Sequence, residues 1–521
     1  MTGLTGHGSD ARGLRIRRAH LPQAVVLVAL AVLAAWPVSA ADDLPTADDL
    51  PWIPLADGID FLSFHLPGPN RAYVARMDIH NPSVSLEGMV AQGDLPGRRE
   101  TVSRMARRYE DSLSAWGGTW GERRDVVVAI NGTFFSPASG IPYGAEVHGG
   151  WFSFWPFDQT GPLTFGWTLD RRVLTSECLV APRELQRAVF PSSGRELLLT
   201  GVDIALPANG LVVYTPEYTQ LVAPVPGSVQ VLVELNRPAM IGPPGQFTFG
   251  AIRAIYADPQ ELQLPFDTVA LVGHGRAATH LLESATLGGT VGLGLTLEDR
   301  GPYCGSNPAT VWSQVYSGLG GGVFFLRGGA YRPPTDGTAS DRHPRTAVCS
   351  NDDRFYFVVV DGRRAGWSIG MTLAEMAEFC ADTLEAEWGI NLDGGGSSTM
   401  WVGGEVINQP SDGQERRVPD GLMMVRLEPA QRSFSFTPGD TVQVTSAVQF
   451  KRGPGWNYLA WGELPDGAQG RILHPLSGLE GVLASGSFWW EVDFGEVSGW
   501  VPEQALSLVT DADPLALPVL P

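Results

Sequence analysis

Lysine is nearly absent from this sequence, which holds a single one, Lys451, among 521 residues. A Walker A phosphate loop, the phosphate-anchoring lysine of a kinase and a Schiff-base catalyst all require a lysine side chain. Because Lys451 lies near the C-terminus, the long segment before it belongs to none of these classes.

Positive charge as a whole is also scarce. The chain has 36 lysine and arginine residues against 56 aspartates and glutamates, for a formal net charge of -20. A surface with this excess of carboxylates repels the phosphates of nucleic acids and anionic lipids. We therefore expect no nucleic-acid partner.

Cysteine is limited to four residues, Cys178, Cys304, Cys349 and Cys380. They allow three pairings, and the sequence does not rank them. Their wide spacing contains no CxxC or zinc-ligand pattern, so no structural metal site is predicted. The sequence requires no cofactor and leaves room for a divalent cation.

One apolar run stands at the N-terminus, from Ala24 to Trp36. A basic stretch, Arg12 to Arg18, precedes it, and the small residues Val38-Ser39-Ala40 follow. This order is typical of a cleaved secretory signal peptide, with a retained signal anchor as the alternative. No later segment is long and apolar enough for a membrane span. We expect a secreted or cell-envelope protein with no stable span after cleavage.

Glycine and proline are abundant, with 63 and 40 residues, which favours turns and short strands. The length requires more than one unit. Composition and texture predict a signal peptide at 1–40, linkers at 41–51 and 429–435, a catalytic domain at 52–428, a small all-β domain at 436–510 and a tail at 511–521.

The clearest local pattern is a strand, a helix and a strand. Phe355 to Val360 is an apolar run that ends at Asp361, Thr372 and Glu375 form a capping box, and Ile390 to Leu392 ends at Asp393. If this is a parallel crossover, the two aspartates lie at one edge of the sheet, where ligands bind in open α/β sheets. Two turn-forming Asp-Gly pairs are the alternative. We expect an α+β fold with a mixed sheet and helices, followed by a small barrel.

Four motifs occur in order along the chain: Asn131-Gly132-Thr133-Phe134-Phe135, Arg342-His343-Pro344-Arg345-Thr346-Ala347-Val348, Asp361-Gly362, and Asn391-Leu392-Asp393-Gly394-Gly395-Gly396-Ser397-Ser398-Thr399-Met400. Together they resemble the phosphodiester glycosidase family, over roughly Trp52 to Arg426. The resemblance implies an exported hydrolase that releases sugar from a glycosyl-1-phosphodiester in a cell-envelope glycan.

The chemistry of that reaction assigns roles to the motif residues. A carboxylate must activate water or attack the anomeric carbon, and the candidates are Asp393 and Asp361, with Glu146 outside the motifs. Arginine forks match phosphate oxygens, and glycines let backbone N–H groups approach an anion. The candidate substrate-binding residues are Asn131, Thr133, Arg342, Arg345, Gly394, Gly395, Gly396, Ser397 and Ser398.

The C-terminal segment resembles a bacterial SH3-like domain, which implies peptidoglycan as a partner. Trp489, Trp490 and Trp500 are candidates for its binding face, and at least one of them is expected in the core. A non-catalytic wall- or glycan-binding protein is the competing interpretation for the whole chain. A metal-dependent phosphodiesterase is disfavoured, because His343 alone among the histidines lies in a motif.

Overall fold

The computed structural model describes residues 46–93, 98–114, 122–156, 163–217, 221–239, 241–300, 309–334, 339–495 and 497–509. The predicted signal peptide, the predicted tail at 511–521 and Cys304 lie outside these ranges. Within them, none of the helices has the length and apolar character needed to span a bilayer.

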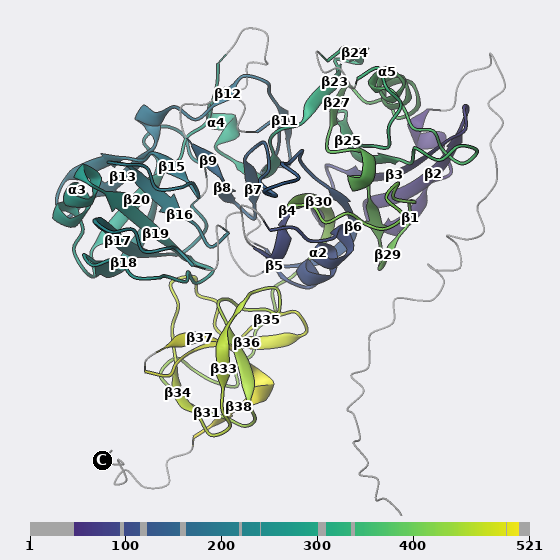
Figure 1. The fold of residues 1–521 in the computed structure, drawn as a ribbon. Coiled ribbons are helices and arrows are strands. Elements are labelled where there is room, and N and C mark those ends of the chain that lie inside the picture. Colours follow the sequence, from purple (N-terminus) through teal and green to yellow (C-terminus); the bar gives the residue numbers. More distant parts are fainter. Residues whose placement is uncertain are drawn as a thin grey trace, which may run out of the picture. The chain divides into compact units, whose positions relative to one another are not determined.

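Two antiparallel sheets packed face to face carry the four motifs (Figure 1). The main sheet contains, in spatial order, β1 (Ile53–Ala56), β2 (Ile59–Leu66), β3 (Asn70–Asp78), β26 (Arg354–Val360), β25 (Arg345–Ser350), β27 (Trp388–Asn391), β23 (Val323–Arg327) and β24 (Ala330–Tyr331). The second sheet contains β29 (Glu405–Val406), β28 (Met400–Val402), β6 (Glu122–Asn131), β30 (Asp420–Glu428) and β4 (Val84–Val90), with β5 (Leu113–Ser114) beside β6.

Alternating side chains give each of these sheets two buried faces. Phe357 and Val359 of the main sheet and Ile130 of the second sheet share the core between the sheets. On the outer faces, α5 (Leu373–Glu378) covers the main sheet and α2 (Val102–Tyr109) covers the second sheet. The capping box predicted at Thr372 and Glu375 is present. These layers hold the motif loops on rigid strands.

The expected α+β class with a mixed sheet and helices is wrong. The chain is 45% strand and 10% helix, so it is mainly β. The strand–helix–strand unit is present, and β26 and β27 point the same way in one sheet. β25 lies between them and pairs antiparallel with both. Among the named pairs of the described residues, β15 and β16 alone run in parallel.

The middle of the chain forms further, mainly antiparallel sheets around a core of its own. One contains β11 (Val173–Thr175), β10 (Phe165–Thr168), β22 (Val315–Leu319), β7 (Glu146–His148) and β8 (Trp151–Ser153). Another contains β14 (Arg195–Leu198), β13 (Arg187–Phe190), β20 (Thr290–Gly294), β18 (Thr248–Tyr256), β17 (Ser228–Leu235), β19 (Thr268–His274), β16 (Leu211–Tyr214), β15 (Gly201–Val202) and β9 (Trp155–Pro156). The remaining elements here are β12 (Leu179–Val180), β21 (Glu298–Asp299), α3 (Arg276–Ser284) and α4 (Ala309–Trp312).

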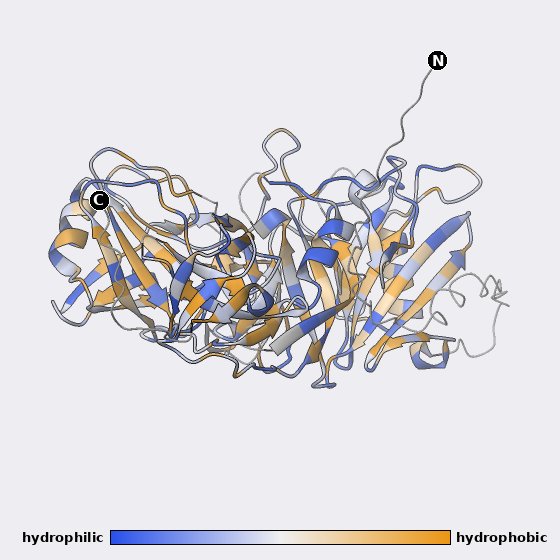
Figure 2. Ribbon diagram, turned by 90° about the horizontal axis from the view of Figure 1, so that it is seen from below, coloured by the Kyte–Doolittle hydropathy of each residue, from blue (hydrophilic) through white to orange (hydrophobic). Residues whose placement is uncertain are grey.

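The C-terminal sheet consists of β31 (Thr441–Val444), β32 (Val448–Lys451), β33 (Ala460–Leu464), β34 (Gln469–Ile472), β35 (Val482–Ala484), β36 (Ser487–Asp493), β37 (Ser498–Pro502) and β38 (Leu506–Leu508). Trp490 is buried in its core, and Trp489 and Trp500 are buried in a cluster with Leu113 and Phe266, so the three tryptophans form no exposed binding face. Throughout the described chain, apolar residues concentrate along the strands, as Figure 2 shows. Short turns of other helix types occur at Ala47–Asp49, Ala91–Gly93, Arg183–Leu185, Phe379–Thr383, Gly395–Ser397 and Glu503–Ala505.

Candidate active site

The ends of strands from both sheets bring the motifs together. Since β26 and β27 both run antiparallel to β25, they point the same way, and Asp361 and Asp393 follow them at one edge. Arg345 begins β25 at that same edge. From the second sheet, Asn131 ends β6 opposite Gly421, next to the first residue of β30. The motif loops therefore lie together at the edge that the sequence predicted. The strands that carry them are held there by antiparallel pairing with β25.

Asn131 ties three of these loops together. Its side-chain amide donates to the backbone oxygen of Asp393 at 2.7 Å. Its oxygen accepts from the Thr346 hydroxyl at 2.8 Å and from the Thr399 backbone N–H at 3.1 Å. The residue is fully buried. Asn131 thus positions the Asp393 loop from within the protein.

Asp393 lies at this edge of the main sheet and is partly exposed. Burial raises its pKa from 3.8 to about 6, against the opposing effects of a hydrogen bond from Ser397 and the charge of Arg416. Its backbone N–H donates to the Gly132 oxygen at 3.0 Å. A carboxyl group with this pKa is ionised at neutral pH and can act as a base or nucleophile.

Asp420, the first residue of β30, is a second carboxyl group at the site, and the motif reasoning missed it. It accepts from the Thr133 N–H and the Thr133 hydroxyl, both at 2.7 Å. Burial raises its pKa to about 6, and the charge of Asp393 acts in the same direction. A β-carbon added to Gly132 would meet an Asp420 oxygen at 2.2 Å, so this approach requires glycine. The one local signal was an Asp-Gly pair directly before an apolar strand.

Two arginines outside the predicted set flank the glycine loop. A β-carbon added to Gly395 would lie 3.0 Å from an Arg363 nitrogen, and one added to Gly396 would lie 2.1 Å from an Arg416 nitrogen. Arg416 pairs with Asp412 at 2.8 Å and donates to the Ser397 hydroxyl at 3.3 Å. Arg363 is exposed and lies 3.4 Å from the His343 ring nitrogen Nδ1. The cations closest to the loop are therefore Arg363 and Arg416.

The two arginines singled out by the motif have other partners. Arg342 forms an ion pair with Glu375 of the α5 capping box and is exposed. Arg345 is buried, and its guanidinium donates to the backbone oxygens of Met371 at 2.9 Å and Asp341 at 2.8 Å. The contacts with Glu375 and Met371 fasten the Arg342–Arg345 segment to α5 and to the residues just before it.

Asp361 is buried and surrounded by donors. It accepts from Asn408 Nδ2 at 3.1 Å, from the Gln409 N–H at 2.9 Å, from the Tyr73 hydroxyl at 3.2 Å and from Trp367 Nε1 at 3.3 Å. Burial raises its pKa, and these hydrogen bonds oppose the shift. With both oxygens engaged, Asp361 organises the loops behind Asp393.

Glu146, on β7, lies deeper than the motif carboxylates. It is fully buried, and neither of its carboxyl oxygens has a hydrogen-bond partner. Burial raises its pKa well above 4.5, with the charges of Asp420 and Glu217 adding to the shift. Glu146 is therefore a buried carboxyl group near Asp420 whose ionisation is disfavoured.

The remaining predicted residues lie in the loop after Asp393. Gly394 packs against the Pro344 oxygen, and Ser398 is buried with its hydroxyl unpaired. Within the described ranges no group of three or more His, Cys, Asp or Glu side chains is arranged to hold a metal ion. The arrangement as a whole places ionisable carboxyl groups beside a glycine loop bordered by cations, which suits an anionic substrate and acid–base chemistry.

Comparison with known proteins agrees with this chemistry over part of the chain. Residues 276–425 match the family model described as phosphodiester glycosidase, which indicates a glycosidase-type hydrolase. That segment contains Arg363, Asp393, Arg416 and Asp420, while Asn131 and Glu146 lie before it. An SPbeta prophage-derived uncharacterized protein, YomE, of Bacillus subtilis (strain 168) is 36% identical over 135 residues, which are 24% of this chain and 20% of that protein. The match thus spans about a fifth of that relative's length.

Three solved structures are similar to this chain over part of its length. A hypothetical protein from Synechocystis has a TM-score of 0.47 at 18% identity, covering 72% of this chain and 63% of that one. A putative exported protein from Burkholderia pseudomallei K96243 has a TM-score of 0.45 at 22% identity, covering 70% and 75%. The zebrafish N-acetylglucosamine-1-phosphodiester alpha-N-acetylglucosaminidase catalytic domain, auto-inhibited by its pro-peptide, has a TM-score of 0.30 at 15% identity, covering 71% and 82%.

Proposed function

We propose that this chain hydrolyses a glycosyl-1-phosphodiester bond and releases sugar from a phosphate diester of a cell-envelope glycan or related conjugate. The observation that carries the proposal is the position of Asp393. Its partly exposed carboxyl group, with a pKa of about 6, precedes a glycine loop that Arg363 and Arg416 border. The family match over residues 276–425 supports the reaction class.

In the proposed reaction, Arg363 and Arg416 bind the single negative charge of the phosphodiester. Guanidinium forks match phosphate oxygens, and loop N–H groups add further donors. Asp393, ionised at neutral pH, acts at the anomeric carbon, either by activating water or by direct attack. The departing phosphomonoester is a good leaving group, so the reaction needs little general-acid assistance.

The other motif residues act as positioning groups in this proposal. Asn131 fixes the Asp393 backbone, Thr133 fixes Asp420, and Arg345 fixes the segment at the start of β25. Such groups keep the reacting atoms aligned, which supplies a large part of the rate. The proposal requires no cofactor. An activity assay with and without a chelator decides whether a divalent cation takes part.

We further propose that the protein is exported and that the C-terminal sheet holds it at peptidoglycan. The N-terminal sequence pattern supports export. Since the core tryptophans are buried, Trp456, which is 45% exposed, is the aromatic group on which wall contact would depend. Sedimentation of the full chain with purified peptidoglycan tests this: loss of retention in Trp456→Ala supports it, and no retention of the wild type contradicts it.

The catalytic proposal is tested by replacing the loop cations and the carboxyl group separately. We expect Asp393→Asn to lower kcat and Arg363→Gln mainly to raise KM, because Arg363 binds the charge of both ground state and transition state. Asp258→Asn, at an exposed position far along the chain from the motifs, is the matched control. Wild-type turnover in both site variants would contradict the assignment.

A further inference from the structure

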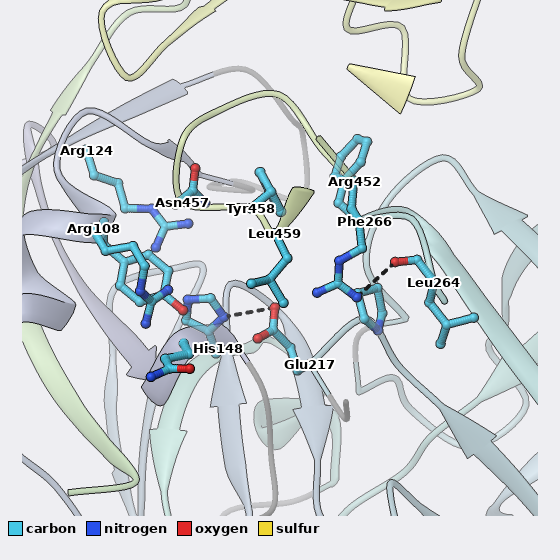
Figure 3. Close-up of a pocket in the computed structure, with 13 residues that line it drawn as sticks. Arg108, Arg124, His148, Glu217, Leu264, Phe266, Arg452, Asn457, Tyr458 and Leu459 are labelled. Atoms are coloured by element: carbon cyan, nitrogen blue, oxygen red, sulfur yellow. Dashed lines mark hydrogen bonds and ion pairs between the residues drawn. The ribbon is translucent and has the colours of Figure 1, made fainter. Parts of the chain in front are cut away.

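A polar cavity whose lining contains no residue of the glycine loop lies where the middle of the chain meets the C-terminal sheet. Its wall brings together the side chains of Arg108 from α2, Arg124 from β6, His148 from β7 and Arg452, which follows β32 (Figure 3). Glu217 is the one carboxylate on the wall. None of the motifs contributes to it.

The cations of this cavity are held in place, with Arg124 and Arg452 buried and Arg108 half-buried. Arg108 pairs with Glu100 at 2.8 Å, and Arg452 donates to the Leu264 oxygen at 3.3 Å. Arg124 is 5% exposed, and it donates through Nε to the Leu113 oxygen at 3.1 Å. Fixed guanidinium groups in a water-poor space bind anions without reorganisation.

Several buried polar atoms of the cavity lack hydrogen-bond partners. These include Arg124 Nη1, which has a carboxylate oxygen of Glu87 at 3.7 Å, and both ring nitrogens of His148. Glu217 faces His148 at 3.5 Å through one oxygen, while its other oxygen, Oε2, accepts no hydrogen bond. Buried polar atoms are nearly always satisfied, so this set indicates a ligand with matching groups.

The unsatisfied atoms specify that ligand. Arg124 supplies an N–H donor and requires acceptor oxygens on the ligand, whereas Glu217 Oε2 is an acceptor and requires a donor. A tetrahedral oxyanion that keeps a proton at neutral pH provides both. We propose that this cavity binds hydrogen phosphate, with oxygens on the arginines and its P–OH on Glu217. Sulfate has the same shape but no proton, so the Glu217 oxygen would face it without a hydrogen bond.

Titration calorimetry of the full chain with inorganic phosphate and with sulfate tests the proposal. We expect one phosphate per chain, bound more than about tenfold more tightly than sulfate, because a site built for a donor rejects the analogue that lacks it. In Glu217→Gln, the side-chain amide can donate to either anion, and the preference should largely disappear. The wild-type comparison alone decides the matter if that variant fails to fold.

A control separates this cavity from the proposed catalytic loop. Arg363→Gln removes a cation from the loop and leaves the cavity intact, so phosphate binding should persist even where turnover is impaired. Equal affinity for the two anions, no binding of either, or loss of the phosphate signal in Arg363→Gln would each overturn the proposal. None of these results bears on whether a glycosyl phosphodiester is hydrolysed.

Discussion

At the scale of single residues, environment separates the roles of the aspartates. Asp361 is surrounded by donors and buried, whereas Asp393 is partly exposed. Asp420 is buried, as Asp361 is, and the negative charge of Asp393 helps to raise its pKa. The side chain best placed to reach a substrate is therefore that of Asp393.

The first prediction concerns the pH dependence of activity. If ionised Asp393 acts on the substrate, kcat/KM rises as pH increases through about 6 and then levels off, following its raised pKa. Asp393→Asn should lower kcat by at least about 100-fold. A pH–rate profile measured from acid to neutral pH checks this, and a flat profile over that range would count against the role.

The second prediction concerns the stability contributed by Asp420. Its pKa is raised from 3.8 to about 6, so between these values the folded protein keeps a proton that the unfolded chain has lost. Folding stability from this group is present at low pH and falls as pH rises through 6. An asparagine keeps an oxygen for the Thr133 N–H and does not ionise.

Relative to wild type, Asp420→Asn should therefore gain about 1–3 kcal/mol between pH 4 and pH 7.5. Urea unfolding of both proteins at the two pH values measures the difference. If the variant's relative stability does not change with pH, the raised pKa of Asp420 is refuted.

At the scale of elements, close approach of strands and loops sets the geometry of the site. The glycine loop after β27 has no room for side chains, because Arg416 and Asp412 lie directly over Gly396. Asn131 at the end of β6 links this loop to the main sheet. The site is thus formed by contacts between segments that are far apart in the sequence.

The third prediction tests that packing. In Gly396→Ala the new methyl group would lie 2.1 Å from Arg416 and 2.2 Å from Asp412, so the charged ends of these two side chains must move. We expect a loss of activity of about tenfold or more. Gly242→Ala, where the nearest atom is 3.6 Å away, is the matched control and should resemble wild type in a turnover assay. Equal activity of the two variants would show that the Arg416–Asp412 arrangement is dispensable.

The elements that the sequence predicts correctly are those with a local signature. The apolar run from Phe355 to Val360 forms β26, and the Thr372 capping box begins α5. The insertion of β25 between β26 and β27 depends on pairing over long separations, which periodicity does not encode. The sequence therefore predicted that Asp361 and Asp393 lie at one edge, but not that an antiparallel strand separates the strands before them.

The candidate site shows the same division. The sequence identifies Asn131 and Asp393 because their motifs follow apolar strands. Arg363 directly follows the Asp361-Gly362 motif, whereas Arg416 and Asp420 come from segments without a distinctive pattern, and tertiary contacts bring all three to the loop. The arginines of the predicted motif instead bind Glu375 and backbone oxygens.

At the scale of the whole molecule, buried carboxyl groups with raised pKa values are a recurring feature. Burial raises the pKa of Glu110 to about 8 and that of Glu491 to about 7. Burial also raises the pKa values of Asp393 and Asp420, to about 6 in each case. Together with the net charge of -20, these groups make ionisation unfavourable for the folded state.

The fourth prediction follows from this feature. Each raised carboxyl pKa contributes stability that is present below the unfolded value and lost as pH rises through the folded value. Between pH 6 and pH 8 the urea midpoint should therefore fall, chiefly through Glu491 and Glu110. Equilibrium unfolding at constant ionic strength measures it, and an unchanged or higher midpoint at pH 8 would refute the combined effect.

The central claim is that a carboxylate at the glycine loop cleaves the bond between sugar and phosphate. Its most direct test is product analysis of the full chain, with and without a chelator, on a panel of sugar-1-phosphodiesters that includes UDP-N-acetylglucosamine. Release of free sugar and a phosphomonoester is the predicted result, with Asp393→Asn inactive. Release of sugar-1-phosphate would instead show cleavage of the other phosphoester bond and contradict the account.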